Sequence, residues 1–126
     1  MKIYIATAFT NVERYHEVKD KLEQLGHEIT FDWTESKVAD RKAATDDVRG
    51  VADANIVIGI FEEEYVYKGA IFELGFAYAL AIPIFILGSW LDSMVFMHLA
   101  HIHKFSNLED LIAAFEEGEV IEGGKK

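Results

Sequence analysis

The sequence predicts an α/β protein in which helices cover both faces of a doubly wound parallel sheet. Three observations lead to this fold class. Short apolar runs alternate with segments whose apolar residues recur at helical spacing. Two of the runs, 56–60 and 84–87, are unbroken, which is typical of strands covered on both faces. The 126 residues include one proline and no cysteine, so the chain fits neither a proline-rich disordered segment nor a disulfide scaffold.

The first half of the chain alternates between strands and helices. The apolar run at 3–5 predicts the first strand. Apolar residues over 12–25 recur at helical spacing, and Gly26 directly after them ends this helix. A second strand is expected over 27–31. The polar residues 32–46 predict a loop that leads into a helix before the next buried strand.

The second half repeats this alternation. Residues 69–80 predict a helix, which Pro83 ends before the second buried strand. A short helix at 91–100 and a strand at 102–105 are expected next. A capping box that begins at Ser106 then predicts the start of the last helix.

Five strands in a chain of this length suit a flavodoxin-like sheet of order 2-1-3-4-5. We expect a single domain over 1–126 with a frayed tail at 116–126. Ligands of such sheets bind beyond the carboxyl ends of the strands. The loops after residues 6, 31, 60 and 87 are therefore expected to surround one crevice.

The charge of the chain argues against several classes of partner. Its formal net charge is −10, which repels nucleic-acid backbones and anionic membrane surfaces. The absence of cysteine fits a reducing compartment, and the start of the chain resembles no signal peptide, so a cytoplasmic location is expected. Residues 69–90 are apolar enough to suggest a membrane span, but Glu73 and Pro83 interrupt them.

Glu73 is the residue that most strongly indicates chemistry. It is the only carboxylate in 69–90, and its neighbours in the predicted helix are apolar. Burying a carboxylate there is costly unless it is hydrogen-bonded. An ionised, partly desolvated carboxylate is a good nucleophile toward an anomeric carbon. The alternative is a solvent-facing glutamate on an amphipathic helix, and the residue pattern leaves both open.

Other candidates are less distinct. Asp46 and Asp47 cannot be separated by chemistry alone, and Tyr4 is either a core residue or a hydroxyl directed at a carboxylate. The histidines at 98, 101 and 103 suggest a metal site, but a change from helix to strand would make their rings diverge. No glycine-rich dinucleotide or phosphate loop occurs. We expect neither a metal nor a cofactor.

Several blocks match one known family in order and spacing. They are Lys2-Ile3-Tyr4-Ile5-Ala6, Leu25-Gly26-His27, Phe31-Asp32-Trp33, Asp47-Val48-Arg49-Gly50-Val51 and, most specifically, Lys68-Gly69-x-x-x-Glu73-Leu74-Gly75-Phe76-Ala77. With these blocks, the chain resembles the nucleoside 2-deoxyribosyltransferase family over residues 2–112. The resemblance implies a flavodoxin-like fold and a homo-oligomer, a dimer or higher, in which a neighbouring subunit completes the active site.

The resemblance also implies a reaction, which is base exchange on 2′-deoxynucleosides. The glutamate matched by Glu73 attacks C1′, and a free nucleobase or water then attacks the deoxyribosyl–enzyme. Asp47 matches an aspartate that handles the proton on the base, and Tyr4 matches a tyrosine that hydrogen-bonds the nucleophile. The remaining matches are substrate-binding positions: Phe9 in a loop that stacks on the base, Trp33, Tyr67, Gly69, and Asp92, which contacts the sugar 5′ group from the adjacent subunit.

Two positions bear on the choice of substrate. A carboxylate at Asp92 accepts a hydrogen bond from a 5′-hydroxyl but repels a 5′-phosphate, which favours nucleosides over nucleotides. Tyr67 stands where the transferases often have a base-binding aspartate, which leaves open a nucleoside or nucleotide hydrolase. A non-catalytic nucleotide-binding module is the third possibility, and it predicts binding without turnover.

Overall fold

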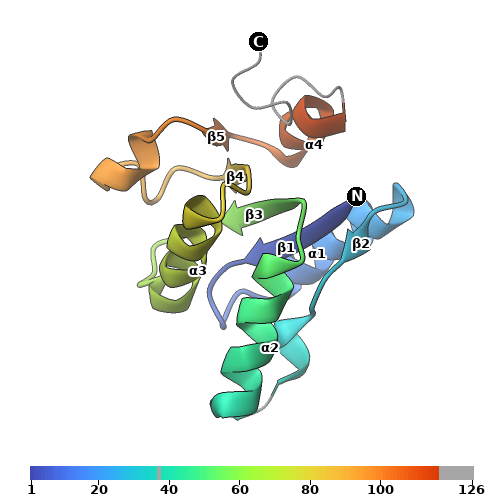
Figure 1. Cartoon of the computed structure of the whole chain (residues 1–126). Helices are drawn as coiled ribbons and strands as arrows, with labels where there is room; N and C mark the ends of the chain where they lie inside the picture. Colours follow the sequence, from blue (N-terminus) through green and yellow to red (C-terminus); the bar gives the residue numbers. More distant parts are fainter. Residues whose placement is uncertain (37, 117–126) are drawn as a thin grey trace.

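Five parallel strands form one sheet in the computed structural model of the chain, which describes residues 1–36 and 38–116 (Figure 1). The strand order is β2-β1-β3-β4-β5, and every neighbouring pair is parallel. The predicted flavodoxin-like fold class is therefore confirmed. The strands are β1 (Lys2–Ala6), β2 (Glu28–Ile29), β3 (Ile56–Ile60), β4 (Ile84–Leu87) and β5 (Ile102–Phe105).

Helices cover both faces of this sheet. They are α1 (Val12–Gln24), α2 (Arg41–Ala52), α3 (Lys68–Ala79) and α4 (Leu108–Glu116), with short 3₁₀ helices η1 (Trp33–Glu35) and η2 (Val95–His98). α2 and α3 contact each other on the face to which Tyr4 of β1 points. α1 and α4 lie on the other face, where the ring of Phe115 in α4 is 5.2 Å from His27, just after α1. This arrangement leaves the carboxyl ends of the strands free to carry a site.

The apolar stretch at 69–90 is divided between two elements. Most of it forms α3 and β4, and every residue of β4 is buried beneath the neighbouring helices. Among the described residues, no helix has the length and hydropathy that crossing a bilayer requires. Part of the apolar surface of this stretch is therefore buried in the core around the sheet.

Two elements of the first half differ from the predicted ones. The strand expected at 27–31 is reduced to β2, because the chain leaves the sheet at Thr30 and Asp32 then caps η1 by accepting a hydrogen bond from the Thr34 amide. The second helix begins at Arg41, inside the expected loop. Its start is fixed by Asp40, whose carboxylate accepts a hydrogen bond from the Ala43 amide at 2.9 Å.

Two expectations in the second half also change. The helix expected at 91–100 is only the 3₁₀ helix η2. The last helix is capped by Asn107 and not by Ser106, because the Asn107 side chain accepts a hydrogen bond from the Asp110 amide at 2.8 Å. Of the frayed tail expected at 116–126, Glu116 is the last residue of α4, and 117–126 lie outside the described residues.

Candidate active site

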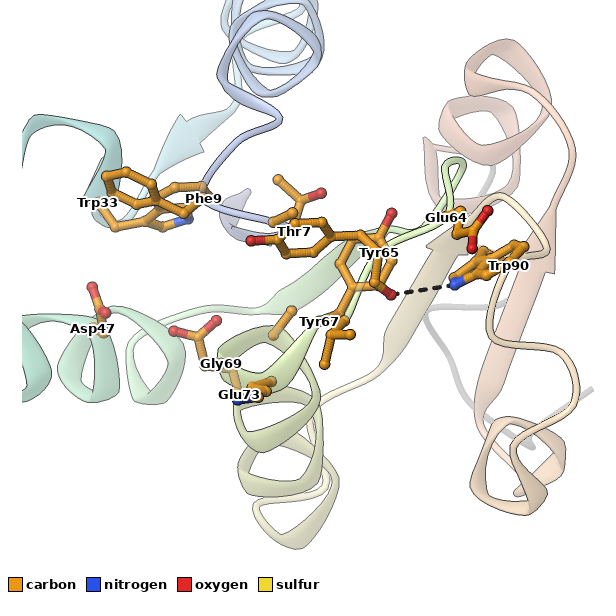
Figure 2. A pocket seen from close by; sticks show the side chains of 14 residues that line it. Thr7, Phe9, Trp33, Asp47, Glu64, Tyr65, Tyr67, Gly69, Glu73 and Trp90 are labelled. Carbon is orange, nitrogen blue, oxygen red and sulfur yellow. Dashed lines mark hydrogen bonds between the residues drawn. The ribbon is translucent and has the colours of Figure 1, made fainter.

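A pocket of about 790 Å³ opens at the carboxyl ends of β1 and β3, between the loops that follow them and the N-terminal part of α3 (Figure 2). This is the crevice that the doubly wound topology predicts. Six of the residues expected in the site line the pocket together: Phe9, Trp33, Asp47, Tyr67, Gly69 and Glu73.

Glu73, which is half-buried and lines the pocket, pairs with the buried Tyr4. The Tyr4 hydroxyl donates a hydrogen bond to Oε2 of Glu73 at 2.6 Å, and the tyrosine is 0% exposed. Gly50 in α2 makes room for the tyrosine, because a Cβ there would lie 3.0 Å from its ring carbon Cδ1. Tyr4 is therefore both a core residue and a hydroxyl directed at a carboxylate, and Glu73 is half-buried instead of facing the solvent freely.

The surroundings of Glu73 change its acidity. Burial raises its pKa to about 7, an effect that the hydrogen bond from Tyr4 opposes and the nearby charge of Asp47 reinforces. The pKa of the Tyr4 hydroxyl is raised far above its usual value, first by burial and then by Glu73. Tyr4 therefore remains a hydrogen-bond donor at any physiological pH. Glu73 ionises near neutrality, so a carboxylate with little hydration is available there.

Asp47 and Asp46 occupy different environments, although they are neighbours on α2. Asp46 pairs with Lys42 at 2.7 Å on the exposed side of the helix. Asp47 lines the pocket, and its Oδ1 atom is buried with no hydrogen-bond partner among the described residues. Burial, and to a lesser degree the charge of Asp46, raises the pKa of Asp47. Of the two neighbouring aspartates, Asp47 lines the pocket and Asp46 does not.

Two aromatic side chains, Phe9 and Trp33, line the pocket, and Figure 2 draws both at the same end of it. The Trp33 indole N–H donates to the Ile5 carbonyl at 2.7 Å. The Trp33 ring packs edge-on against the Tyr15 ring, with 4.9 Å between the ring centroids. Because the N–H of Trp33 is already used, the residue offers the pocket an apolar surface. Phe9 is 66% exposed and free to contact a ligand.

Tyr67 and Asp92 lie differently from the other expected residues. Tyr67 precedes α3 and is buried, and its hydroxyl donates to the Glu63 carbonyl at 2.5 Å. It therefore forms part of the wall, and its hydroxyl is already engaged. Asp92 does not line this pocket. It borders a smaller hollow of about 340 Å³, where its Oδ1 lies 3.9 Å from Nζ of Lys104.

The pocket also contains residues that the sequence patterns do not single out. Thr7, Glu64, Tyr65 and Trp90 line it. Thr7 joins the ends of two strands, because its hydroxyl donates to the Ile60 carbonyl at 2.7 Å. The topology places the loops of all four residues at the crevice, but nothing in the local pattern shows which of their side chains face it. Among the described residues, no three histidine or acidic side chains are grouped closely enough to hold a metal ion.

The fold and the pocket together define a class of protein. A flavodoxin-like sheet carries a desolvated glutamate held by a buried tyrosine, with a second carboxyl group beside aromatic rings, which are the elements needed to cleave an N-glycosidic bond. The sequence profile of the family described as "Nucleoside 2-deoxyribosyltransferase" matches residues 3–122. The chain belongs to this family, so its activity is of the nucleoside deoxyribosyltransferase class.

Solved structures of similar proteins share the fold of the chain. A 2-deoxyribosyltransferase from Bacillus psychrosaccharolyticus is 27% identical with a TM-score of 0.68, covering 88% of this chain and 90% of that one. A conserved protein from Enterococcus faecalis V583 is 18% identical with a TM-score of 0.67, covering 94% and 98% of the two chains. The CMP N-glycosidase of Clostridium botulinum is 16% identical with a TM-score of 0.64, covering 93% and 98%. None of the curated proteins compared with the chain matches it.

Proposed function

We propose that the protein exchanges the base of 2′-deoxynucleosides through a covalent deoxyribosyl–Glu73 intermediate. The observation that carries this proposal is the Glu73 carboxyl group, which is desolvated, ionises near neutrality and is fixed by Tyr4 in a pocket with a second carboxyl group. A carboxylate in this state is a stronger nucleophile than a hydrated one, because little solvent must be removed before it attacks.

The two steps balance in atoms and electrons. With Oε2 engaged by Tyr4, Oε1 of Glu73 attacks C1′, and the C1′–N bond breaks with its electron pair on the departing base. Asp47, which lines the pocket and has a buried carboxyl oxygen without a partner among the described residues, donates the proton that the base nitrogen takes up. A second base then attacks C1′ from the opposite face, displaces Glu73 and returns its proton to Asp47. Two inversions give net retention at C1′.

The aromatic end of the pocket suits the nucleobase. We place the base against Phe9 and Trp33, next to Asp47, where stacking requires no hydrogen bond from Trp33. Gly69 lies at the start of α3, and a Cβ built there would meet nothing within 4 Å. The protein itself does not require glycine at this position, so we propose that the open space is occupied by the substrate's sugar. Tyr67 contributes the wall beside it.

Chromatography of reaction mixtures tests the proposal. The enzyme is incubated with each common 2′-deoxynucleoside and a different free base, and new nucleoside and released base are measured. The proposal expects a new nucleoside that depends on the added base. Absence of both products with every common base would contradict it.

A hydrolase on the same scaffold is the second candidate. Tyr67 favours it. This position often carries a base-binding aspartate in the transferases, but here it is a tyrosine whose hydroxyl already donates to the Glu63 carbonyl. No carboxylate is therefore available at this position for an incoming base. In this case water attacks the deoxyribosyl–Glu73 intermediate. Base would be released at the same rate with or without an added second base, which distinguishes the two candidates in the same assay.

Replacing Tyr4 with phenylalanine is expected to slow the reaction without abolishing it. The hydroxyl holds one oxygen of Glu73, and a single hydrogen bond to a charged group contributes about 1.5–3 kcal/mol, so we expect kcat to fall by about 10- to 100-fold. Its loss also removes the interaction that lowers the pKa of Glu73, so the acid limb of the rate profile should move to higher pH. Steady-state kinetics over a pH series measures both, and an unchanged rate and profile would remove Tyr4 from the site.

The rate should pass through a maximum as pH changes. Attack on C1′ needs the ionised form of Glu73, whose pKa burial raises to about 7, and departure of the base needs the proton that Asp47 holds. The rate is therefore expected to fall on the acid limb as Glu73 takes up a proton and on the alkaline limb as the interacting pair of carboxyl groups loses its last proton. Measuring single-turnover base release between pH 5 and 9 checks this, and a flat profile across neutrality would contradict it.

A neighbouring subunit is proposed to complete the site with Asp92. Within one chain, Asp92 lies outside the pocket that holds Glu73. Large apolar side chains also remain exposed on the single chain, among them Phe72 at 66% and Phe96 at 62% exposure. If Asp92 acts across an interface, mixing inactive Glu73→Gln subunits with Asp92→Ala subunits should restore activity after exchange, whereas each variant alone stays impaired. No recovery in mixed oligomers, verified by sedimentation, would overturn the shared site.

A further inference from the structure

An ion pair outside the pocket joins α1 to the loop between β3 and α3. The Arg14 guanidinium donates two hydrogen bonds to the Glu62 carboxylate, from Nε to Oε1 at 2.8 Å and from Nη2 to Oε2 at 3.1 Å. Both side chains are partly shielded, with exposed fractions of 28% and 29%. Two parallel contacts fix the relative orientation of the side chains, which a single contact would leave free to rotate. The pair therefore holds together two segments that lie 48 residues apart in the sequence.

Arg14 stands at a position of α1 that does not favour a cation. It is the third residue of the helix, where the N-terminal end of the helix dipole favours acidic side chains. Its contact with Glu17 in the same helix is longer, at 3.7 Å, and the Glu17 side chain is 66% exposed, so this second pair contributes little. The bidentate contact with Glu62 is therefore the interaction that accounts for an arginine at this position.

Residues 62–67, which we call the wall loop, form one side of the pocket. The wall loop contributes three lining residues, Glu64, Tyr65 and Tyr67 (Figure 2). The Trp90 indole N–H, from the loop after β4, donates to the Tyr65 carbonyl at 3.2 Å. Arg14 holds the first residue of the wall loop from α1, the helix that follows β1. Because β1 and β4 flank β3 in the sheet, the wall loop is tied to elements on both sides of the strand that it follows.

We propose that Arg14 is a positioning residue which, through Glu62, places the wall loop for binding of the nucleoside. The inference rests on the proposed function, because it takes a nucleoside as the ligand of the pocket. Arg14 is not one of the residues that line the pocket, and the Tyr4–Glu73 pair is held by a separate hydrogen bond at 2.6 Å. The helix α3, which follows the wall loop, is anchored by its own buried residues, so a shift of the loop leaves Glu73 in place. Loss of the ion pair should therefore weaken binding more than it slows the chemical step.

Removing either partner of the ion pair tests this role. Arg14→Gln and Glu62→Gln should each raise KM for the most reactive deoxynucleoside about fivefold and change kcat less than about twofold, because the wall loop binds ground state and transition state alike. Lys19→Gln is the matched control. It breaks the Lys19–Glu23 ion pair, at 3.2 Å in the same helix, and should leave both constants unchanged. Unchanged KM in both variants, a fall in kcat without a rise in KM, or an equal rise in the control would overturn the proposal.

Exchanging the two charges separates positioning from general stability. Arg14→Glu alone brings two carboxylates together and should raise KM more than Arg14→Gln does. The same change suits the N-terminal end of α1, so the Tm should not fall in proportion. Adding Glu62→Arg to Arg14→Glu restores an attractive pair and should lower KM again by at least about threefold. A double variant that binds no better than Arg14→Glu, or a KM that follows the Tm through the whole series, would overturn the positioning role.

Binding separates failure of the positioning role from failure of the proposed function. Both tryptophans of the chain, Trp33 and Trp90, line the pocket, so quenching of intrinsic fluorescence reports ligand binding without turnover. The unaltered protein and the two variants are titrated with each common 2′-deoxynucleoside. If no deoxynucleoside reacts, the proposed reaction fails, but a higher Kd for Arg14→Gln than for Lys19→Gln still supports the positioning role. Equal Kd values for the two variants, or no binding to the unaltered protein, would overturn it.

Discussion

The Glu73→Gln variant is expected to lose base exchange by at least about 1,000-fold while remaining folded. Glutamine has nearly the same shape as glutamate, and its amide oxygen can still accept the hydrogen bond that Tyr4 donates at 2.6 Å. An amide is a poor nucleophile, so no deoxyribosyl–enzyme should form. Single-turnover measurement of base release, together with mass spectrometry of the intact protein, tests for the covalent intermediate in the unaltered enzyme and for its absence in the variant.

The same substitution should make the protein more stable at alkaline pH. Burial raises the pKa of Glu73 from 4.5 to about 7, so the folded state binds more protons than the unfolded state between these values. The unaltered enzyme therefore loses stability as pH rises through this window, by up to about 3 kcal/mol. The glutamine side chain of the Glu73→Gln variant does not ionise, so the gain in Tm of the variant should be small below pH 4.5 and largest above pH 7.

These two results distinguish a nucleophile from a structural residue. If Glu73 stabilised the fold, its replacement would lower the free energy of unfolding. If Glu73 is retained for its reactivity, its replacement should raise the free energy of unfolding, because the cost of desolvating the carboxylate is removed. Ligand-induced quenching of Trp33 and Trp90 should persist in the variant, which shows that the pocket still binds. Substantial remaining activity would remove Glu73 from the nucleophilic role.

The buried strands and the identity of Glu73 as a candidate could be predicted because each depends on a local signal. Unbroken apolar runs mark the buried strands β3 and β4, and a single carboxylate in an apolar helix marks Glu73. The start of α2 could not be predicted, because the polar residues before it resemble a loop until Asp40 is seen to cap the helix. Short polar segments have several local alternatives, and tertiary packing chooses among them.

The site residues that the local pattern misses depend on distant contacts. Asp46 and Asp47 are adjacent on α2, but only Asp47 lies on the side of the helix that faces the pocket. Trp90 faces the pocket because its indole is held by the Tyr65 carbonyl, from a loop far away in the sequence. Tyr67 matches a substrate-binding position, but only the structure shows that its hydroxyl is already bound to the Glu63 carbonyl. Such side-chain orientations follow from the packing of the loops at the sheet's carboxyl edge.

Asp47→Asn is expected to lower the rate of base release by about 100- to 10,000-fold, because an amide cannot donate the proton that the departing base nitrogen needs. Asp46→Asn provides a matched control: it removes the same charge from the adjacent position, but Asp46 pairs with Lys42 outside the pocket lining, so its activity should stay close to that of the unaltered enzyme.

A substrate with a different leaving group shows whether the slower reaction of the Asp47→Asn variant arises from lost proton transfer or from altered binding or folding. A 2-deoxyriboside whose leaving group departs as a stable anion, such as p-nitrophenolate, needs no proton from Asp47. The Asp47→Asn variant should therefore form the deoxyribosyl–Glu73 intermediate from this substrate at nearly the unaltered rate, because Glu73 and Tyr4 remain paired. A misfolded or misassembled site would slow both substrates alike. Equal loss on both substrates would contradict the assignment of Asp47 as the general acid, whereas rescue by the better leaving group would locate its contribution at the proton on the base.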